Sequence, residues 1–267
     1  MQKYYSQNGE DFLLDQIFKG KPNGFFVEIG CLEGIVFSNT YAFEKKGWKG
    51  ICVEAHNGFI AELRRNRNGS TVIHCAVGEA DKDNVTFYAN KIGSLSTLDK
   101  KMEDRWNQTH KSFFYGFEEQ IVNMRTLTTI FDENKVSSID FISLDIEGYE
   151  VEALLGLDLN KYRPRLMVIE YKDEEHKNRL EAILSPQGYI HLSTLNENMF
   201  YGNQPQDKFI LDRNYGKIQL TRLSENGGEY LEEVELKKPS FMDKVVFKLR
   251  LEFNKMFRKP KPKNSNV

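Results

Sequence analysis

The sequence predicts an α/β fold in which a mostly parallel sheet carries helices on both faces. Short apolar runs alternate with helical stretches from about residue 24 to residue 192. Such alternation is typical of parallel sheets, because a helix connects each strand to the next. A glycine turn follows the first apolar run, and acidic residues end several runs. Since ligands bind beyond the carboxyl ends of parallel strands, we expect the functional site at that edge.

The individual elements follow from the period of the apolar residues. Apolar runs predict five main strands, at residues 24–29, 50–54, 71–77, 139–145 and 164–170. Helical spacing predicts helices at residues 38–46, 59–67, 127–134, 150–155 and 176–184. We expect three further strands, one extending the sheet region and two forming a closing pair, at residues 85–89, 188–192 and 209–211. No internal repeat is visible, which excludes a solenoid.

Residues 91–124 are polar, rich in aromatic residues and weakly periodic. A connection of this length is commonly functional. We therefore predict an inserted lid or substrate segment at 91–124 and expect it to determine substrate specificity.

Composition limits the class of protein. The 267 residues suffice for one large domain with a modest appendage, and the net charge of −2 argues against a nucleic-acid partner. No window approaches about 18 consecutive apolar residues, and the N-terminal residues lack the apolar core of a signal peptide. The spacing of Cys31, Cys52 and Cys75 fits neither a zinc motif nor a disulfide framework. Buried, reduced thiols and a cytoplasmic location are the expectation.

The turn that runs from Glu28 to Gly34 is the strongest local motif. Its glycines, Gly30 and Gly34, allow the backbone to approach a ligand closely. A dinucleotide-binding fingerprint would need glycine where Glu28 stands. A carboxylate there would repel a pyrophosphate but suits the cationic end of S-adenosylmethionine. The alternative is a plain strand–helix turn that needs two glycines.

Glu54 strengthens the nucleoside-binding interpretation. It ends the second predicted strand 24 residues after Gly30, close to the offset of about 20 residues at which an acid meets ribose hydroxyls. Alone, Glu54 could equally be a surface acid at a strand end. Together with the glycine turn it favours a nucleoside site.

Acidic residues also follow the fourth and fifth predicted strands. Asp145 and Glu147 could bind the methionine end of the cofactor, orient or deprotonate an acceptor, or hold a metal. Alternatively, Glu147 caps the next helix and Glu150 faces solvent on it. Asp145 and Glu170 could together ligate Mg²⁺ or Mn²⁺, the alternative for Glu170 being a hydrogen-bonded or lysine-paired carboxylate. His110 and His191 are weaker candidate bases, and a structural role is favoured for each.

Taken together, the motifs resemble the FkbM family of S-adenosylmethionine-dependent methyltransferases over most of the chain, from Ser6 to about Leu192. The resemblance rests on ordered matches at Ser6-Gln7, Glu10-Asp11, 26–30, Gly34, 38–40, 47–50, Val53-Glu54, 76–78, 139–150 and Glu170. It implies a Rossmann-like class I methyltransferase fold: a seven-stranded sheet with one antiparallel strand. It also implies O-methylation, typically of sugars, glycans or polyketide-type natural products.

The resemblance further implies positions for the site residues. Around S-adenosylmethionine it places Gln7, Glu28, Gly30, Ser38, Glu54, Ala76 and Asp145. It places Asp145 and Glu147 where cofactor and acceptor meet, as the candidate catalytic pair. The implied domain covers residues 1–202. The aromatic-rich segment 91–124 matches no family pattern.

Residues 203–259 form a predicted C-terminal extension. Within it, residues 240–259 place apolar side chains at helical spacing with lysine and arginine on the other faces. This basic amphipathic helix could lie on an anionic membrane surface, or it could pack on the domain or a second subunit, which we favour. Residues 260–267 are predicted to be disordered.

The sequence thus predicts a methyltransferase that acts on a hydroxyl of a sugar, sugar nucleotide, polysaccharide or natural-product precursor. Three alternatives stay open: a different small polar acceptor, a nicotinamide-dependent oxidoreductase, and a non-catalytic membrane-associated protein on a methyltransferase-like fold. Glu28 in place of the first fingerprint glycine argues against the oxidoreductase.

Overall fold

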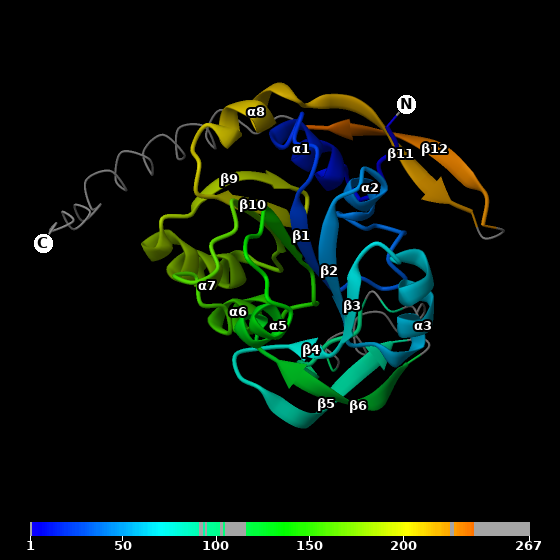
Figure 1. Cartoon of the computed structure of the whole chain (residues 1–267), viewed down its shortest axis with the longest axis vertical. Helices are drawn as coiled ribbons and strands as arrows, with labels where there is room; N and C mark the ends of the chain where they lie inside the picture. Colours follow the sequence, from blue (N-terminus) through cyan, green and yellow to red (C-terminus); the bar gives the residue numbers. More distant parts are fainter. Residues whose placement is uncertain are drawn as a thin grey trace, which may run out of the picture.

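The computed structural model describes residues 2–90, 93, 95–101, 104, 116–224 and 227–237. Its main element is a seven-stranded sheet in the order β3-β2-β1-β7-β8-β10-β9 (Figure 1). The strands are β1 (Phe25–Ile29), β2 (Lys49–Glu54), β3 (Thr71–His74), β7 (Phe141–Leu144), β8 (Leu166–Glu170), β9 (Ile190–Leu195) and β10 (Asn198–Gly202). Only β10 runs antiparallel to its neighbours in this sheet. The predicted fold class is confirmed.

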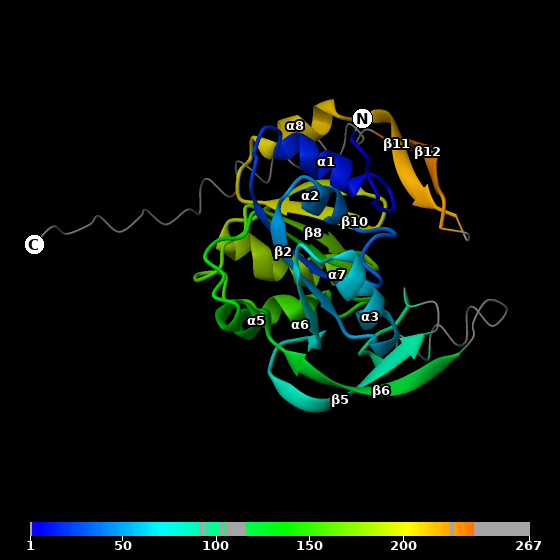
Figure 2. The same ribbon diagram turned by 45° about the vertical axis from the view of Figure 1, so that its right-hand side comes forward.

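Helices cover both faces of this sheet (Figure 2). They are α1 (Glu10–Ile17), α2 (Tyr41–Lys45), α3 (Asn57–Asn66), α5 (Leu127–Glu133), α6 (Glu150–Leu155), α7 (Glu174–Leu184) and α8 (Asp207–Arg213), with a 3₁₀ turn η1 (Ser185–Gln187) after α7. Successive strand residues point to opposite faces. Val27 therefore joins the core under α5, α6 and α7, whereas Phe26 joins the core under α1, α2 and α8. Strands buried on both faces explain the continuous apolar runs of the sequence.

A small second sheet lies beside the main one (Figure 1). It consists of β4 (Ala76–Val77), β5 (Lys82–Asn90) and β6 (Phe117–Arg125), in the order β4-β6-β5. The prediction of a lid over the whole of 91–124 is therefore wrong at its C-terminal end, because residues 117–124 pair with β5. Most of β6 is exposed on one face, so its sequence lacks the apolar run that marks a buried strand. Residues 85–89 form a strand as predicted, but in this second sheet.

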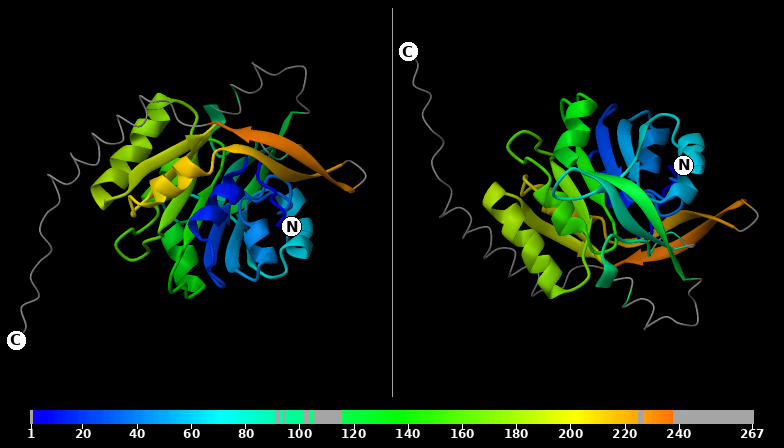
Figure 3. Two further views of the ribbon diagram at one scale, coloured as in Figure 1. Left: turned by 90° about the horizontal axis from the view of Figure 1, so that it is seen from above. Right: turned by 90° about the horizontal axis from the view of Figure 1, so that it is seen from below.

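The chain after the main sheet also differs from the prediction. The closing pair of strands is β9 with β10, and the predicted strand 209–211 lies inside α8. An apolar triplet is too short to distinguish a strand from a helix by period. A hairpin of β11 (Gly216–Leu223) and β12 (Glu229–Leu236) follows, which the sequence analysis missed. Figure 3 shows this hairpin extending along one side of the domain.

Several predictions fall outside the described residues. These are the basic amphipathic helix at 240–259, the disordered tail at 260–267 and His110. Membrane contact or self-association through the C-terminal helix therefore stays a prediction. In the part of the chain that the structure describes, no helix has the length and apolarity needed to cross a membrane.

Candidate functional site

A cavity of about 500 Å³ opens at the carboxyl ends of β1, β2, β7 and β8. This is the edge at which ligands bind in parallel α/β sheets, and the volume suits a small-molecule ligand. The lining includes all the predicted cofactor-binding, catalytic and metal-binding residues: Gln7, Glu28, Gly30, Ser38, Glu54, Ala76, Asp145, Glu147 and Glu170. His191 is not among the lining residues; it lies on β9, where its ring contacts Thr194.

Gly30 joins the two central loops of the cavity. Its φ is +83°, and a Cβ built on it would lie 1.8 Å from the carbonyl oxygen of Asp145. The Gly30 amide donates to the Val53 carbonyl (3.0 Å), and the Asp145 amide donates to the Ile29 carbonyl (3.1 Å). Only glycine permits both this dihedral angle and this contact. The loops after β1 and β7 are therefore fixed against each other.

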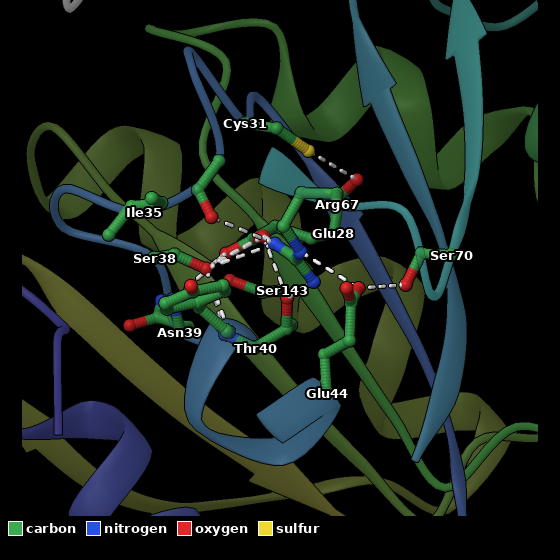
Figure 4. Close-up of polar contacts among 12 residues, drawn as sticks. Glu28, Cys31, Ile35, Ser38, Asn39, Thr40, Glu44, Arg67, Ser70 and Ser143 are labelled. Atoms are coloured by element: carbon green, nitrogen blue, oxygen red, sulfur yellow. Dashed lines mark hydrogen bonds and ion pairs between the residues drawn. The ribbon is translucent and has the colours of Figure 1, made fainter. Parts of the chain in front are cut away.

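Glu28 has a different role from the one its charge suggested. Its carboxylate is buried and accepts hydrogen bonds from Ser38 Oγ (2.9 Å), the Asn39 amide (2.8 Å) and Thr40 Oγ1 (2.7 Å). The fully buried Arg67 of the α3 C-terminus completes the set, with Nη1 at 2.9 Å from Oε2 (Figure 4). Because Arg67 neutralises this carboxylate, Glu28 does not offer the free negative charge for a sulfonium that the sequence analysis expected.

The Glu28–Arg67 pair also holds the loop after β1 in place. Arg67 donates to the carbonyl of Gly34 (3.2 Å), and its Nε reaches Glu44 on α2 at 2.9 Å (Figure 4). One guanidinium thus connects β1, the glycine loop, α2 and α3. A buried charge so fully paired fixes the geometry of the groups around it.

Glu54 lies at the end of β2, where the ribose of a nucleoside was predicted. One carboxylate oxygen accepts from the Leu32 amide (2.8 Å) and the other from the His56 amide (2.7 Å). Burial raises the pKa of Glu54, while these backbone hydrogen bonds act to lower it. The carboxylate is thereby fixed in orientation at the cavity wall.

The ends of β7 and β8 carry a cluster of carboxyl groups around one ammonium. Lys172 Nζ lies 2.7 Å from Glu147 Oε2 and also contacts Glu170. Burial raises the pKa of Glu147 to about 7, although the neighbouring Lys172 acts to lower it. Burial and the adjacent Asp145 likewise raise the pKa of Glu170. Several acids around a single cation make this part of the cavity suitable for a cationic ligand.

Glu150 is buried rather than solvent-facing. Its carboxylate accepts from the amides of Ile146 (2.9 Å) and Gly148 (3.0 Å), which closes the turn after β7. Within this turn Glu147 takes φ +55°, an uncommon value for a residue with a side chain. Glu147 pairs with Lys172, and the predicted helix-capping alternative for it is wrong.

The predicted metal site is not supported by the donor set. Oxygens of Asp145, Glu150 and Glu170 lie within 4.8 Å of one another. However, Glu150 is used by the backbone of the turn, and Lys172 contacts Glu170. A divalent cation would have to displace the Lys172 ammonium, which already pairs with Glu147 and Glu170. The lysine-paired alternative for Glu170 is the one that the structure shows.

Two important residues escaped the sequence analysis. Arg67 ends the helix predicted at residues 59–67, and no local signal marks its partners on β1 and α2. Lys172 carried a weak signal, since it follows Glu170 by two residues and so leaves the same end of β8. Thr97 also contacts the turn after β7: its hydroxyl donates to the Glu147 carbonyl at 3.1 Å.

Comparison with known proteins agrees with this geometry. The sheet order and the position of the cavity define a Rossmann-like class I methyltransferase fold. The family model described as "Methyltransferase FkbM domain" matches residues 20–192, and the chain belongs to this family. It is an S-adenosylmethionine-dependent methyltransferase, which excludes the oxidoreductase alternative. No curated protein sequence matches the chain.

Solved structures with a similar fold include several methyltransferases. A precorrin-6y C5,15-methyltransferase from Geobacter metallireducens has 8% identity and a TM-score of 0.39, over 86% of this chain and 87% of that one. A TehB-like methyltransferase from Corynebacterium glutamicum has 10% identity and a TM-score of 0.39, over 74% and 89%. A ribosomal protein L11 methylase from Lactobacillus delbrueckii subsp. bulgaricus has 10% identity and a TM-score of 0.39, over 73% and 77%. Similarity this remote carries no information about the substrate.

Proposed function

We propose that this methyltransferase transfers the methyl group of S-adenosylmethionine to a hydroxyl oxygen of a sugar or sugar-like acceptor. The observation that carries the proposal is the partly buried Glu147 carboxyl, which lines the cavity beside Lys172 with a pKa of about 7. A sugar hydroxyl is a weak nucleophile and needs a base. A carboxyl group whose pKa is close to the working pH is well matched to that role.

In this proposal the cofactor lies in the cavity with its ribose at Glu54 and its cationic end toward Asp145. Gly30 provides the close backbone approach, and Gln7, Ser38 and Ala76 line the same space. The bound cofactor supplies an electrophilic methyl group on a sulfonium, whose positive charge is lost on transfer. Asp145 lines the cavity beside the Lys172–Glu170 pair, and it is the acid that we expect to face this cationic end.

The residues then divide the chemistry. Glu147 accepts the hydroxyl proton as the acceptor oxygen bonds to the methyl carbon; the carbon–sulfur bond would break in the same step, and S-adenosylhomocysteine would leave as a neutral thioether. Lys172 holds Glu147 in place at 2.7 Å. Alignment of oxygen, carbon and sulfur accounts for most of the expected rate gain, because in-line transfer depends on position. No metal is required, since Lys172 supplies the positive charge in the carboxyl cluster.

The test is methyl transfer from labelled S-adenosylmethionine to saccharides in the presence of EDTA, with the methylated atom identified by mass spectrometry and NMR. We expect methyl ethers on oxygen. Glu147→Gln should lower kcat by about 10²–10⁴-fold while cofactor affinity stays close to that of the wild type. Methylation of nitrogen or carbon, or undiminished turnover by Glu147→Gln, would contradict the proposal.

We also propose that the enzyme works in the cytoplasm. The three cysteines are free and buried, which is typical of proteins in a reducing compartment. Cell fractionation of the producing organism tests this point.

A further inference from the structure

A second cavity, of about 350 Å³, lies beside the first. We call it the hairpin groove, because β11 and β12 form one wall of it with Thr221, Arg222, Tyr230 and Glu232. Tyr5 and the loop around Phe37 form the other wall. Val36 and Phe37 line both cavities. The two cavities are therefore adjacent and share the wall formed by these two residues.

The hairpin is held in place by the segment that also supplies Gln7. Arg222 donates from Nη1 to the Ser6 carbonyl (2.6 Å) and from Nη2 to the Gln7 carbonyl (2.7 Å). The Thr221 amide donates to the Tyr4 carbonyl at 2.6 Å. The groove is thus a fixed part of the domain, and Figures 1 and 2 show the hairpin beside the N-terminus. The hairpin lies outside the family-matched residues 20–192.

The two exposed aromatic rings of the groove suit the apolar face of a sugar. Phe37 is 45% exposed and Tyr230 is 53% exposed. Phe37 also takes φ +60°, which is strained for a bulky residue. Such strain persists where the surrounding structure holds it and tends to mark ligand sites. An exposed ring provides a rigid apolar surface against which the C–H face of a pyranose can pack.

Polar groups in the groove suit the hydroxyls of a sugar. The Thr221 side chain is 3% exposed and lines the groove. Its hydroxyl has no hydrogen-bond partner among the described residues, which is costly for a buried polar atom. Glu232 is half-exposed and offers carboxylate oxygens as acceptors. The groove therefore has an unused hydroxyl and an acid close to two aromatic rings.

Charge distinguishes a neutral sugar from a nucleotide. Among the described lining residues of the groove, Arg222 is the one cation. Its guanidinium is already engaged by two carbonyls and by Glu232 at 2.6 Å. A phosphate would meet the Glu232 carboxylate with no free positive charge beside it.

We infer that the hairpin groove binds a neutral sugar unit next to the one that is methylated, so that the acceptor is an oligosaccharide or glycan rather than a sugar nucleotide. The inference rests on the proposed function and adds the acceptor class to it. Binding energy from such a remote unit is expected to raise the efficiency of transfer.

The experiment compares p-nitrophenyl mono-, di- and trisaccharides and a set of nucleotide sugars as acceptors for the full chain. We expect the best trisaccharide to exceed its monosaccharide in kcat/KM. Phe37→Gly, which also relieves the positive φ, and Tyr230→Ala should each lower the trisaccharide value by about tenfold. The monosaccharide value should not change in Tyr230→Ala, because Tyr230 lines the groove and not the first cavity. Phe37 lines both cavities, so for Phe37→Gly the measured quantity is the ratio of the trisaccharide value to the monosaccharide value, which should fall. Leu231→Ala is the matched control, because Leu231 is 59% exposed on β12 but lies outside the groove.

Thr221 provides a second, oppositely directed test. Thr221→Val removes an unpaired buried hydroxyl, so the melting temperature should stay equal or rise. The same variant should lose trisaccharide efficiency, and Thr221→Ser should retain it. If Thr221 had only a structural role, Thr221→Val would not lower trisaccharide efficiency while the melting temperature stays equal or rises.

The outcomes separate the inference from the proposed function. If saccharides are methylated without dependence on length, or if nucleotide sugars are the best acceptors, the groove inference is wrong and O-methylation stands. If the groove variants change the oligomeric state but not acceptor kinetics, a second copy of the chain occupies the groove, and the inference is again wrong. If no saccharide is methylated, the proposed function fails, and the inference fails with it.

Discussion

At the scale of single residues, the site depends on charges that are paired inside the protein. Arg67 is fully buried and has acidic partners on β1 and α2, Glu28 and Glu44. Removing one partner of such a pair is strongly destabilising, because the other charge is left buried without compensation. The same guanidinium holds the Gly34 carbonyl of the cofactor loop. Arg67 is therefore expected to affect both stability and cofactor binding.

The first prediction concerns Arg67→Met. It should destabilise the protein by about 3–5 kcal/mol and weaken cofactor binding, as measured by denaturant unfolding and calorimetric titration. Adding Glu28→Gln should recover part of both losses, because the unpaired carboxylate is then removed.

A matched control is Arg165→Met. Arg165 pairs with the buried Asp207, 3.0 Å from Nε, and neither residue lines the cofactor cavity. This variant should lose stability while cofactor affinity stays unchanged. Equal cofactor affinity in both variants would show that Arg67 stabilises the fold without positioning the loop.

The second prediction concerns pH. Burial raises the pKa of Glu147 to about 7, so the deprotonated base is lost below neutrality. We expect kcat/KM to fall about tenfold per pH unit below pH 7 and to level off above it. Glu147→Gln should remove this dependence from its residual rate. A profile of unchanged shape in that variant would assign the titration to another group.

The raised pKa of Glu147 affects stability in the opposite direction: activity should rise with pH, whereas the contribution of this group to stability should fall. Glu147 and Glu150, each raised to a pKa of about 7 from 4.5, bind protons more tightly in the folded protein than in the unfolded chain. Their contribution to stability is fully present below pH 4.5 and is lost as the pH rises through about 7. The site is therefore most active where these groups stabilise the fold least.

At the scale of elements, β11 and β12 form a two-stranded sheet that cannot be stable alone. It is fixed mainly by the Arg222 contacts to Ser6 and Gln7 and by packing of Ile218 and Leu236 on the core. Gln7 also lines the cofactor cavity. The segment that holds the hairpin is therefore part of the cofactor site.

The third prediction is that Arg222→Met loosens the hairpin without unfolding the domain. Amides of residues 4–7 and of β11 should exchange faster with deuterium, as measured by mass spectrometry. Amides of β1 and β7 should keep their protection, and cofactor affinity should fall modestly. Protection lost evenly over the main sheet would show instead that the hairpin is part of the global folding unit.

The elements differ in how well the sequence predicted them. The strands buried on both faces, such as Phe141–Leu144, read as apolar runs because both sides of each strand pack on helices. Strands with an exposed face, such as Phe117–Arg125 and Glu229–Leu236, contain several charged residues and no continuous apolar run, and they were missed. The acidic cavity-lining residues, such as Glu54 and Glu170, were predictable because they end strands. Gln7 and Ser38 lie in loops and were predicted from the family resemblance. The partners Arg67 and Lys172 were not, because ion pairs depend on tertiary packing.

At the scale of the whole molecule, the cavity lies at the carboxyl ends of four strands of the main sheet, β1, β2, β7 and β8, so one bound ligand can contact residues at all four ends. A ligand that binds only the folded state stabilises the protein by mass action, by about 2.7 kcal/mol at 100 times its Kd. The fourth prediction is that S-adenosylhomocysteine at that concentration raises the melting temperature by about 5 °C. NADH should give no shift. An equal shift with NADH would contradict the assignment of the cavity to S-adenosylmethionine.

The three cysteines add a consequence at this scale. Cys31 and Cys75 line the cofactor cavity, Cys52 lies in β2 beneath it, and all three are free and buried. Burial raises the pKa of Cys31 and raises that of Cys75 to about 12, so both thiols stay protonated at neutral pH. A thiol that is shielded and protonated reacts with an alkylating reagent only when the protein opens. The rate at which iodoacetamide alkylates the native enzyme therefore measures how often the cavity opens. A bound ligand should lower this rate.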